Sequence, residues 1–356
     1  MSWKNAKVIG SNQKRGAAGQ VRGHKDYVMS RSALVEFSPC PGKWREGKDD
    51  DYSTKSMDFG SIVDCLATCP AELEDRFAIE PATYKSKGMK CPKCGSVTDS
   101  SKCTKCKTER VLIEVDKPWS NLSKTCQDWI QEMKDGGKTV IPAAMFEQAK
   151  LAFSLLRRNE SILELFECSE RQVLISAEWH DKATGVIVPV CGLIDLLPDK
   201  SNPSWGKHLA DLKTARNGNP ALWARVVDDQ GYDVQAALYL DIYRAARPNE
   251  ERIDFTHVVQ ENTHPFHVVS PPPALSSEFI TWGRVKYTNA LNRYAQCLAT
   301  DIWPSYREVG MPFGNTQIIG PESLWSYRQG AGMTDFVAPP ERPEKPKVDE
   351  EKFDIH

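Results

Sequence analysis

The chain has 356 residues, 40% of them hydrophobic and 26% charged, with a mean hydropathy of −0.49. These values are typical of a globular protein with one large domain or two modest ones, and no run of eighteen apolar residues predicts a membrane span. The formal net charge of −2 does not indicate a nucleic-acid binder, although a single groove rich in lysine and arginine would not show in this total. Because the N-terminus M-S-W-K-N-A-K lacks the apolar core of a signal peptide, we expect a cytoplasmic protein.

The N-terminal third predicts a flexible arm followed by helices. Residues 1–25 are polar and basic, so we expect a flexible arm that is either a disordered tail or a segment touching a phosphate backbone. Ser30 suits the N-cap of a helix that ends at Pro39. After an acidic loop at 46–56, M-D-F-G-S-I-V-D-C-L-A has the apolar spacing of a second helix.

The rest of the chain changes from helical to strand periodicity and back. Helices are predicted over roughly 120–135 and 142–166. Three strands then follow, V-L-I-S-A-E-W, G-V-I-V-P-V-C-G-L-I-D-L-L and K-H-L-A-D-L-K, and the turn H-D-K-A-T-G joins the first two. A helix over 221–246, the strand F-T-H-V-V-Q-E and a long closing helix complete the pattern. Residues 336–356 are rich in proline and charge and predict a disordered tail.

Four cysteines between the predicted helices indicate a metal site. Eleven cysteines in a cytosolic chain favour metal binding over disulfides. Two CxxC knuckles separated by eight residues predict a structural Zn²⁺ in a zinc ribbon at about 84–110, with an iron–sulfur cluster as the alternative; the ligands are Cys91, Cys94, Cys103 and Cys106. Protein sulfur fills all four positions, so this metal should not be catalytic. The surrounding lysines fit either contact with DNA or a merely solvated module; they are Lys90, Lys93, Lys102, Lys105 and Lys107.

Two aspartates and a lysine at the ends of adjacent predicted strands indicate a second, catalytic metal. Taken alone, Asp195 is typical of a turn or cap residue, and Asp211 with Lys213 is typical of a surface ion pair. Taken together, two carboxylates from neighbouring strands can share Mg²⁺ or Mn²⁺, with the Leu212 backbone carbonyl and waters as further ligands. Lys213 lies on the same face as Asp211, where its ammonium can orient or help deprotonate an attacking water. This combination predicts metal-dependent phosphodiester chemistry.

Four further side chains are candidates for the same site. Gln235 and Tyr239 lie one helical turn apart, so both face one way, and they either hydrogen-bond a phosphate or the attacking water or are polar spots on an amphipathic helix. Glu178 is a candidate third carboxylate. Asp64 is a candidate further metal ligand.

These motifs, in this order, resemble the PD-(D/E)xK nuclease superfamily and, within it, the phage-type exonuclease VIII (RecE-like) group. The resemblance runs from about Ser30 to Tyr306 and is carried by G-L-I-D, A-D-L-K-T-A and Y-D-V-Q-A-A-L-Y, with F-G-S-I-V-D and V-V-Q-E-N-T-H-P-F in support. Related enzymes usually have a histidine where this chain has Asp64 and a glutamate where it has Leu174. The zinc ribbon is not part of the family pattern.

The resemblance implies an α/β nuclease core over residues 26–335, a mixed sheet flanked by helices, interrupted by the ribbon. It also implies an Mg²⁺-dependent exodeoxyribonuclease that degrades linear double-stranded DNA 5′→3′ and leaves 3′ single strands for a single-strand annealing protein in phage recombination. A homo-oligomer in a bacterial host cell, encoded by a phage or prophage, is the accompanying expectation. The alternatives are a non-catalytic DNA-binding protein on the same fold and a structure-specific endonuclease.

Overall fold

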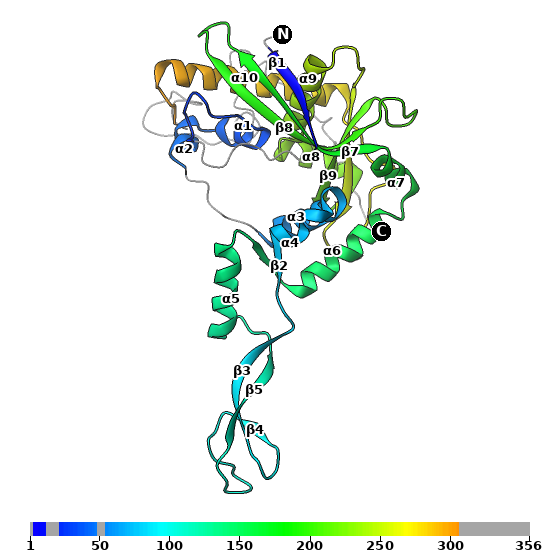
Figure 1. Ribbon diagram of the computed structural model, residues 1–356. Helices are drawn as coiled ribbons and strands as arrows, with labels where there is room; N and C mark the ends of the chain where they lie inside the picture. The colour runs from blue at the N-terminus through cyan, green and yellow to red at the C-terminus, as the bar shows by residue number, and fades with distance from the viewer. Residues whose placement is uncertain (1–2, 12–20, 48–53, 306–356) are drawn as a thin grey trace, which may run out of the picture.

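A five-stranded mixed sheet forms the centre of the molecule. The computed structural model describes residues 3–11, 21–47 and 54–305 (Figure 1). The strand order is β1-β7-β8-β9-β10; the first four strands pair antiparallel with their neighbours, and β10 runs parallel to β9. These strands are β1 (Trp3–Gly10), β7 (Ser169–His180), β8 (Ile187–Pro198), β9 (His208–Ala215) and β10 (Asp254–Glu261).

Helices cover both faces of this sheet, each over its own hydrophobic core. One core packs beneath α1 (Arg31–Phe37), α2 (Pro41–Glu46), α8 (Pro220–Asp229), α9 (Tyr232–Ala246) and α10 (Ser277–Thr300). The other packs beneath α3 (Lys55–Thr68), α6 (Ala143–Leu156) and α7 (Glu160–Glu167). Leu209 belongs to the first core, whereas Ala210 and Leu212 belong to the second, because successive side chains on a strand alternate faces. The expected mixed sheet flanked by helices is confirmed.

Local capping determines where the predicted helices begin and break. The Ser30 hydroxyl accepts from the Ala33 amide as predicted. The predicted helix over 142–166 is two helices, because Asn159 caps a new helix by accepting from the Ile162 amide at 3.1 Å. The predicted helix over 221–246 is likewise broken at Gly231, whose φ of +63° is a left-handed conformation that glycine adopts without steric cost.

The N-terminal segment differs from its prediction. Trp3–Gly10 is an edge strand paired with β7, so a flexible arm is wrong for these residues. The Trp3 side chain packs edge-on against Trp179 with ring centroids 5.0 Å apart, and Ala6 and Val8 pack on the core. The lysines between them point to solvent, and their charge hid this alternation in the sequence. Residues 12–20, most of the acidic loop and the predicted tail at 336–356 lie outside the described residues.

A long hairpin projects away from the body and carries the four cysteines at its tip (Figure 1). It consists of β3 (Thr83–Lys90) and β5 (Val111–Pro118), with the short β4 (Val97–Thr98) beside β3. The base joins a two-stranded parallel pair, β2 (Phe77–Ile79) with β6 (Thr139–Ile141), which packs in the same core as α3. The remaining elements near the base are η1 (Pro70–Glu72), α4 (Leu73–Arg76) and α5 (Lys124–Asp135). None of the helices in the described part of the chain combines the length and hydropathy needed to cross a bilayer.

Candidate active site

A pocket of about 470 Å³ lies between α3, α9 and the strands β8 and β9. It brings together most of the residues that the sequence singled out, and these are Asp64, Asp195, Asp211, Leu212, Lys213, Gln235 and Tyr239. The lining is mainly polar, in contrast to a larger cavity of about 750 Å³ between α8 and α10 that contains none of these residues.

Asp211 is the most heavily engaged group in the pocket. Its carboxylate is 2% exposed, forms an ion pair with the Lys213 ammonium, and accepts a hydrogen bond of 2.6 Å from the Gln235 amide on α9. Burial, the largest single effect, would raise the pKa of Asp211, but the charge and the hydrogen bond of Lys213, with smaller effects of His257 and Asp195, together lower it. In turn, burial would lower the pKa of Lys213, but the Asp211 charge helps to raise it. The spacing D-x-K therefore places a charged acid and a charged base on one face, as predicted.

Asp195 faces Asp211 from the adjacent strand. Its Oδ2 accepts from the Leu212 backbone amide at 3.1 Å, and its Oδ1 accepts from the Gln172 side chain at 3.3 Å. Burial, followed by the charges of Asp211 and Asp64, raises the pKa of Asp195 well above its usual range. The carboxyl thus lies where negative charge is costly unless a cation is close.

Asp64 reaches the pocket because α3 crosses β9 at close range. The close approach occurs at Gly60, where a Cβ atom would lie 2.6 Å from the Thr214 Oγ1 atom. Burial, then the charge of Asp211, raises the pKa of Asp64 to about 6. The glycine in F-G-S-I-V-D therefore allows α3 to pack this closely against β9.

Gln235 and Tyr239 both face the pocket from α9, one turn apart, as predicted. Tyr239 is buried and packs against the backbone of β8, where a Cβ on Gly192 would lie 2.5 Å from its ring. The glycine of G-L-I-D thus makes room for the tyrosine of Q-x-x-x-Y.

Four residues in or near the pocket were not predicted from the sequence, and they are Arg31, Gln172, Tyr232 and His257. Arg31 donates to the Gln235 Oε1 atom at 3.4 Å, and both Arg31 and Lys213 lie over the Tyr232 ring, at 5.4 and 4.5 Å from its centroid. Gln172 bonds Asp195, and His257 neighbours Asp211 on β10. Arg31 directly follows the predicted N-cap Ser30, but nothing in the sequence indicated that its side chain faces the pocket.

Glu178 is not brought into the pocket. It lies farther along β7, where it accepts from the Asn5 amide at 2.8 Å and pairs with His180 at 3.1 Å. These two hydrogen bonds lower the pKa of Glu178, and the one with His180 has the larger effect. The carboxylate therefore has partners of its own at the sheet edge. The structure gives it no contact with the predicted metal ligands.

The donor chemistry of the pocket fits a hard divalent cation. Asp211 is buried and Asp195 is partly buried beside it in side-chain contact, and the Lys213 ammonium pairs with Asp211. Carboxylate oxygens are preferred ligands of Mg²⁺ and Mn²⁺, which would relieve the repulsion that raises the pKa of Asp195. Asp64 does not complete a compact triad: among the described residues, only the four cysteines bring three or more such ligand atoms within 4.8 Å of one another.

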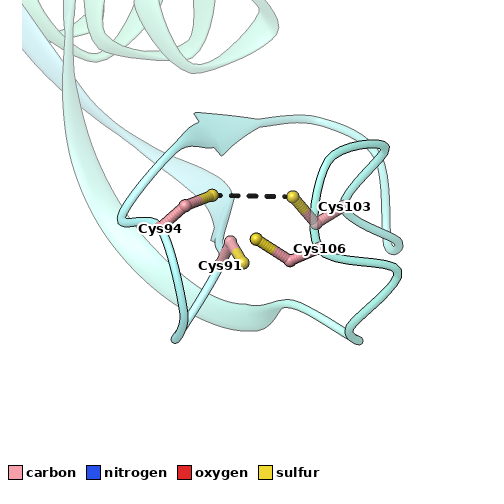
Figure 2. Close-up of side chains that lie close together, drawn as sticks. All are labelled: Cys91, Cys94, Cys103 and Cys106. Atoms are coloured by element: carbon pink, nitrogen blue, oxygen red, sulfur yellow. Dashed lines mark hydrogen bonds between the residues drawn. The ribbon is translucent and has the colours of Figure 1, made fainter.

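The four predicted cysteines do form a cluster at the hairpin tip (Figure 2). The Cys94 and Cys103 sulfurs are 3.6 Å apart, close to the edge of about 3.8 Å that a tetrahedron with Zn–S bonds of about 2.3 Å requires. The Cys106 backbone amide lowers the pKa of Cys103 to about 5, which favours the thiolate that zinc binds. The set could hold Zn²⁺ with no position left for substrate.

Comparison with known proteins identifies one matching family and weakly similar solved structures. A family described as a PDDEXK-like domain of unknown function (DUF3799) matches residues 30–310. No curated protein matches the chain. The solved structures that are weakly similar include the following two. One, titled "Putative exonuclease" from Eubacterium rectale, has 14% identity over 88% of this chain and 98% of that chain, with a TM-score of 0.46. The other, Candida albicans Rai1 in complex with pU5-Mn²⁺, has 12% identity over 79% of this chain and 70% of that chain, with a TM-score of 0.23. Because the family match covers more than half of the chain, the protein belongs to the DUF3799 family of PDDEXK-like domains.

Proposed function

We propose that this pocket is the active site of a metal-dependent exodeoxyribonuclease that hydrolyses phosphodiester bonds of linear double-stranded DNA. The observation that carries the proposal is the clustering of Asp195, Asp211 and Lys213 at the wall of one polar pocket, where Lys213 pairs with the buried Asp211. Membership of a PDDEXK-like family supports the reaction class, because nucleases of this superfamily use divalent metals. Digestion from the 5′ end, leaving 3′ single strands for an annealing protein in phage recombination inside a bacterial host, is part of the proposal.

Each side chain has a distinct role in this scheme. Asp195 and Asp211 hold Mg²⁺ or Mn²⁺, with the Leu212 carbonyl as a further ligand, and the metal supplies polarisation of the phosphoryl oxygen when bound. Lys213 orients the attacking water and offsets the negative charge that develops on the phosphorus oxygens. The Gln235 amide holds Asp211 in position at 2.6 Å, and its oxygen accepts from Arg31. Tyr239 shapes the wall beside β8.

Two cations lie beside the acids in the pocket, and one of them, Lys213, pairs with Asp211. The Lys213 and Arg31 side chains converge on the Tyr232 ring, so a phosphate entering between them and the metal would meet charge on both sides. Such an arrangement favours a phosphodiester substrate over an uncharged one. Asp64 lines the same pocket from α3 and is a candidate ligand to the metal through water.

The test is digestion of a linear duplex labelled at either 5′ or 3′ ends, in Mg²⁺ and in Mn²⁺. We expect early loss of the 5′ label, no cutting of covalently closed circles, and a fall of about 100- to 1,000-fold in rate for Lys213→Ala, the loss typical of removing one charge-stabilising donor. Lys207→Ala is the matched control, because Lys207 immediately precedes β9 but pairs at the surface with Glu251 at 2.8 Å.

Other outcomes separate the competing functions. Cutting of closed or branched DNA would identify a structure-specific endonuclease. Binding of DNA by the wild type without digestion in either metal would identify a non-catalytic DNA-binding protein, and the proposal would then be wrong.

A further inference from the structure

We infer that the zinc ribbon at the hairpin tip is a second DNA-binding surface, which holds the phosphate backbone of the duplex at a distance from the active-site pocket. This inference rests on the proposed function, since it takes duplex DNA as the substrate. It concerns residues 90–110, here called the ribbon tip, and makes no use of the pocket residues.

Charge is distributed very unevenly between the ribbon tip and the rest of the chain. Residues 90–110 contain six lysines and arginines against two acids, a formal charge of +4, while the whole chain has −2 and the other residues therefore sum to −6. Four thiolates with one Zn²⁺ would contribute −2 and still leave the tip positive. A small positive module on a negative protein is the expected electrostatic footprint of a phosphate-binding surface.

The lysines of the tip are free to bind a ligand. All five are exposed, and within the described ranges none of them takes part in an ion pair; they are Lys90, Lys93, Lys102, Lys105 and Lys107. Of the three hairpin lysines closer to the body, two are paired, Lys85 with Asp116 at 2.9 Å and Lys117 with Asp99 at 3.3 Å, whereas Lys87 on β3 forms no ion pair within the described ranges. The only arginine of the tip, Arg110, is buried and donates to Thr98 and Ser96. Arg110 therefore holds the loop together, while the lysines face outward.

The cysteine cluster fixes these lysines as a rigid group. Lys93 and Lys105 each lie inside a CxxC knuckle, and Lys102 immediately precedes Cys103. The knuckle backbones are held by bonds from the Gly95 amide to the Cys91 carbonyl and from the Lys107 amide to the Cys103 carbonyl, both 2.9 Å. A surface of this kind loses little entropy on binding a regular polyanion.

The shape of the hairpin matches a partner that extends beyond the pocket. Eight residues in each strand span about 26 Å at about 3.3 Å per residue, which corresponds to about eight base pairs of B-DNA at 3.4 Å each. The hairpin extends from β2, which lies near α3 and packs in the same core (Figure 1). The helix α3 also carries Asp64, which lines the pocket. A duplex with one end at the pocket could thus be held along its length by the ribbon tip.

Fluorescence anisotropy with a labelled 30-base-pair duplex at several salt concentrations tests the inference. All proteins carry Lys213→Ala, so that digestion during the measurement is slowed about 100- to 1,000-fold. Replacing Lys93, Lys102 and Lys105 together by Gln should weaken binding at least about tenfold at 0.1 M salt and reduce the slope of log K against log salt by about 2.7, or 0.9 for each phosphate that the protein no longer neutralises. Replacing the same three by Arg should retain both values, because the charge is kept.

The matched control changes the same amount of charge elsewhere. Lys25, Lys134 and Lys182 are exposed lysines outside the ribbon tip, and their joint replacement by Gln should leave affinity and slope unchanged. Zinc content of one ion per chain in each variant verifies that the ribbon is folded. Unchanged binding of the duplex by the ribbon variant overturns the inference. Digestion by the chain with Lys213 intact is scored separately, and its absence overturns the proposed function alone.

Discussion

Gln172 lies directly opposite Asp195, between the register pairs Arg171–Leu196 and Val173–Ile194, and its φ is +52°. A glutamine in this left-handed conformation costs about 1–2 kcal/mol. The conformation lets one amide nitrogen donate to Thr68 at 3.0 Å and to Asp195 at 3.3 Å, so strain in β7 accompanies the orientation of an active-site carboxylate.

Replacing Gln172 separates the two effects. Gln172→Ala and Gln172→Gly both remove the amide, and we expect metal affinity or digestion rate to fall about 10- to 100-fold in each, as when a residue that orients a metal ligand is lost. Only glycine relieves the backbone strain, so Gln172→Gly should be more stable to urea than Gln172→Ala by about 1 kcal/mol. Equal stability of the two variants would show that the positive φ stores no energy.

His257 predicts a pH dependence of folding. It is fully buried beside Asp211, and burial, then the Lys213 charge, lowers the pKa of His257 to about 3. The unfolded histidine titrates near its ordinary value of about 6.5, so between these two values the unfolded state binds more protons. The free energy of unfolding should therefore fall by about 1.4 kcal/mol for each pH unit below about 6.5.

His257→Asn isolates this contribution, because an asparagine oxygen can still accept the hydrogen bond that Trp223 donates to Nδ1 at 3.2 Å. Urea unfolding from pH 7 to pH 5 should give a shallower loss of stability for the variant than for the wild type. Parallel curves would mean that folding does not lower the pKa of His257. The raised pKa of Asp64 acts in the opposite direction, since its stabilising effect is lost as pH rises through about 6, and it is common to both proteins.

Zinc removal should unfold the ribbon without unfolding the nuclease core. None of the residues from Thr83 to Pro118 belongs to either hydrophobic core of the described chain, so the hairpin depends on its own strands and metal. We expect Cys103→Ala, or a chelator, to abolish amide-exchange protection in β4 and in the ends of β3 and β5 that border the cysteines, and to change protection in α9 and β9 little. Loss of protection in β9 would show that the ribbon supports the sheet.

The features of the fold and site that could be predicted from the sequence are those determined by residues close together in the chain. The hairpin of β7 and β8 and its turn were predictable, because Asp181 and Gly185 supply ordinary turn chemistry. The D-x-K spacing likewise placed Asp211 and Lys213 on one face. What could not be predicted is long-range: Arg31 reaches Gln235 across 204 positions, and Gln172 reaches Thr68 across 104. Glu178 was predicted as a site residue but lies outside the pocket. The sequence shows that Glu178 is on the strand before Asp195, but it does not show which part of that strand lies beside the pocket.

Gly60 should be intolerant of even one methyl group, and the reason allows a rescue. A Cβ at this position would lie 2.6 Å from Thr214 Oγ1, too close for any real contact, so Gly60→Ala must push α3 away from β9. Asp64, one helical turn further along, would then move out of the pocket, and digestion should fall at least about tenfold, with a loss of about 1–3 kcal/mol in stability. Thr214→Ala removes the obstructing oxygen, and the double variant should recover most of both losses. If the double variant is as impaired as Gly60→Ala alone, the close approach of α3 to Thr214 is not what fixes Asp64, and the helix must be held in place by its other core residues such as Ile62 and Val63.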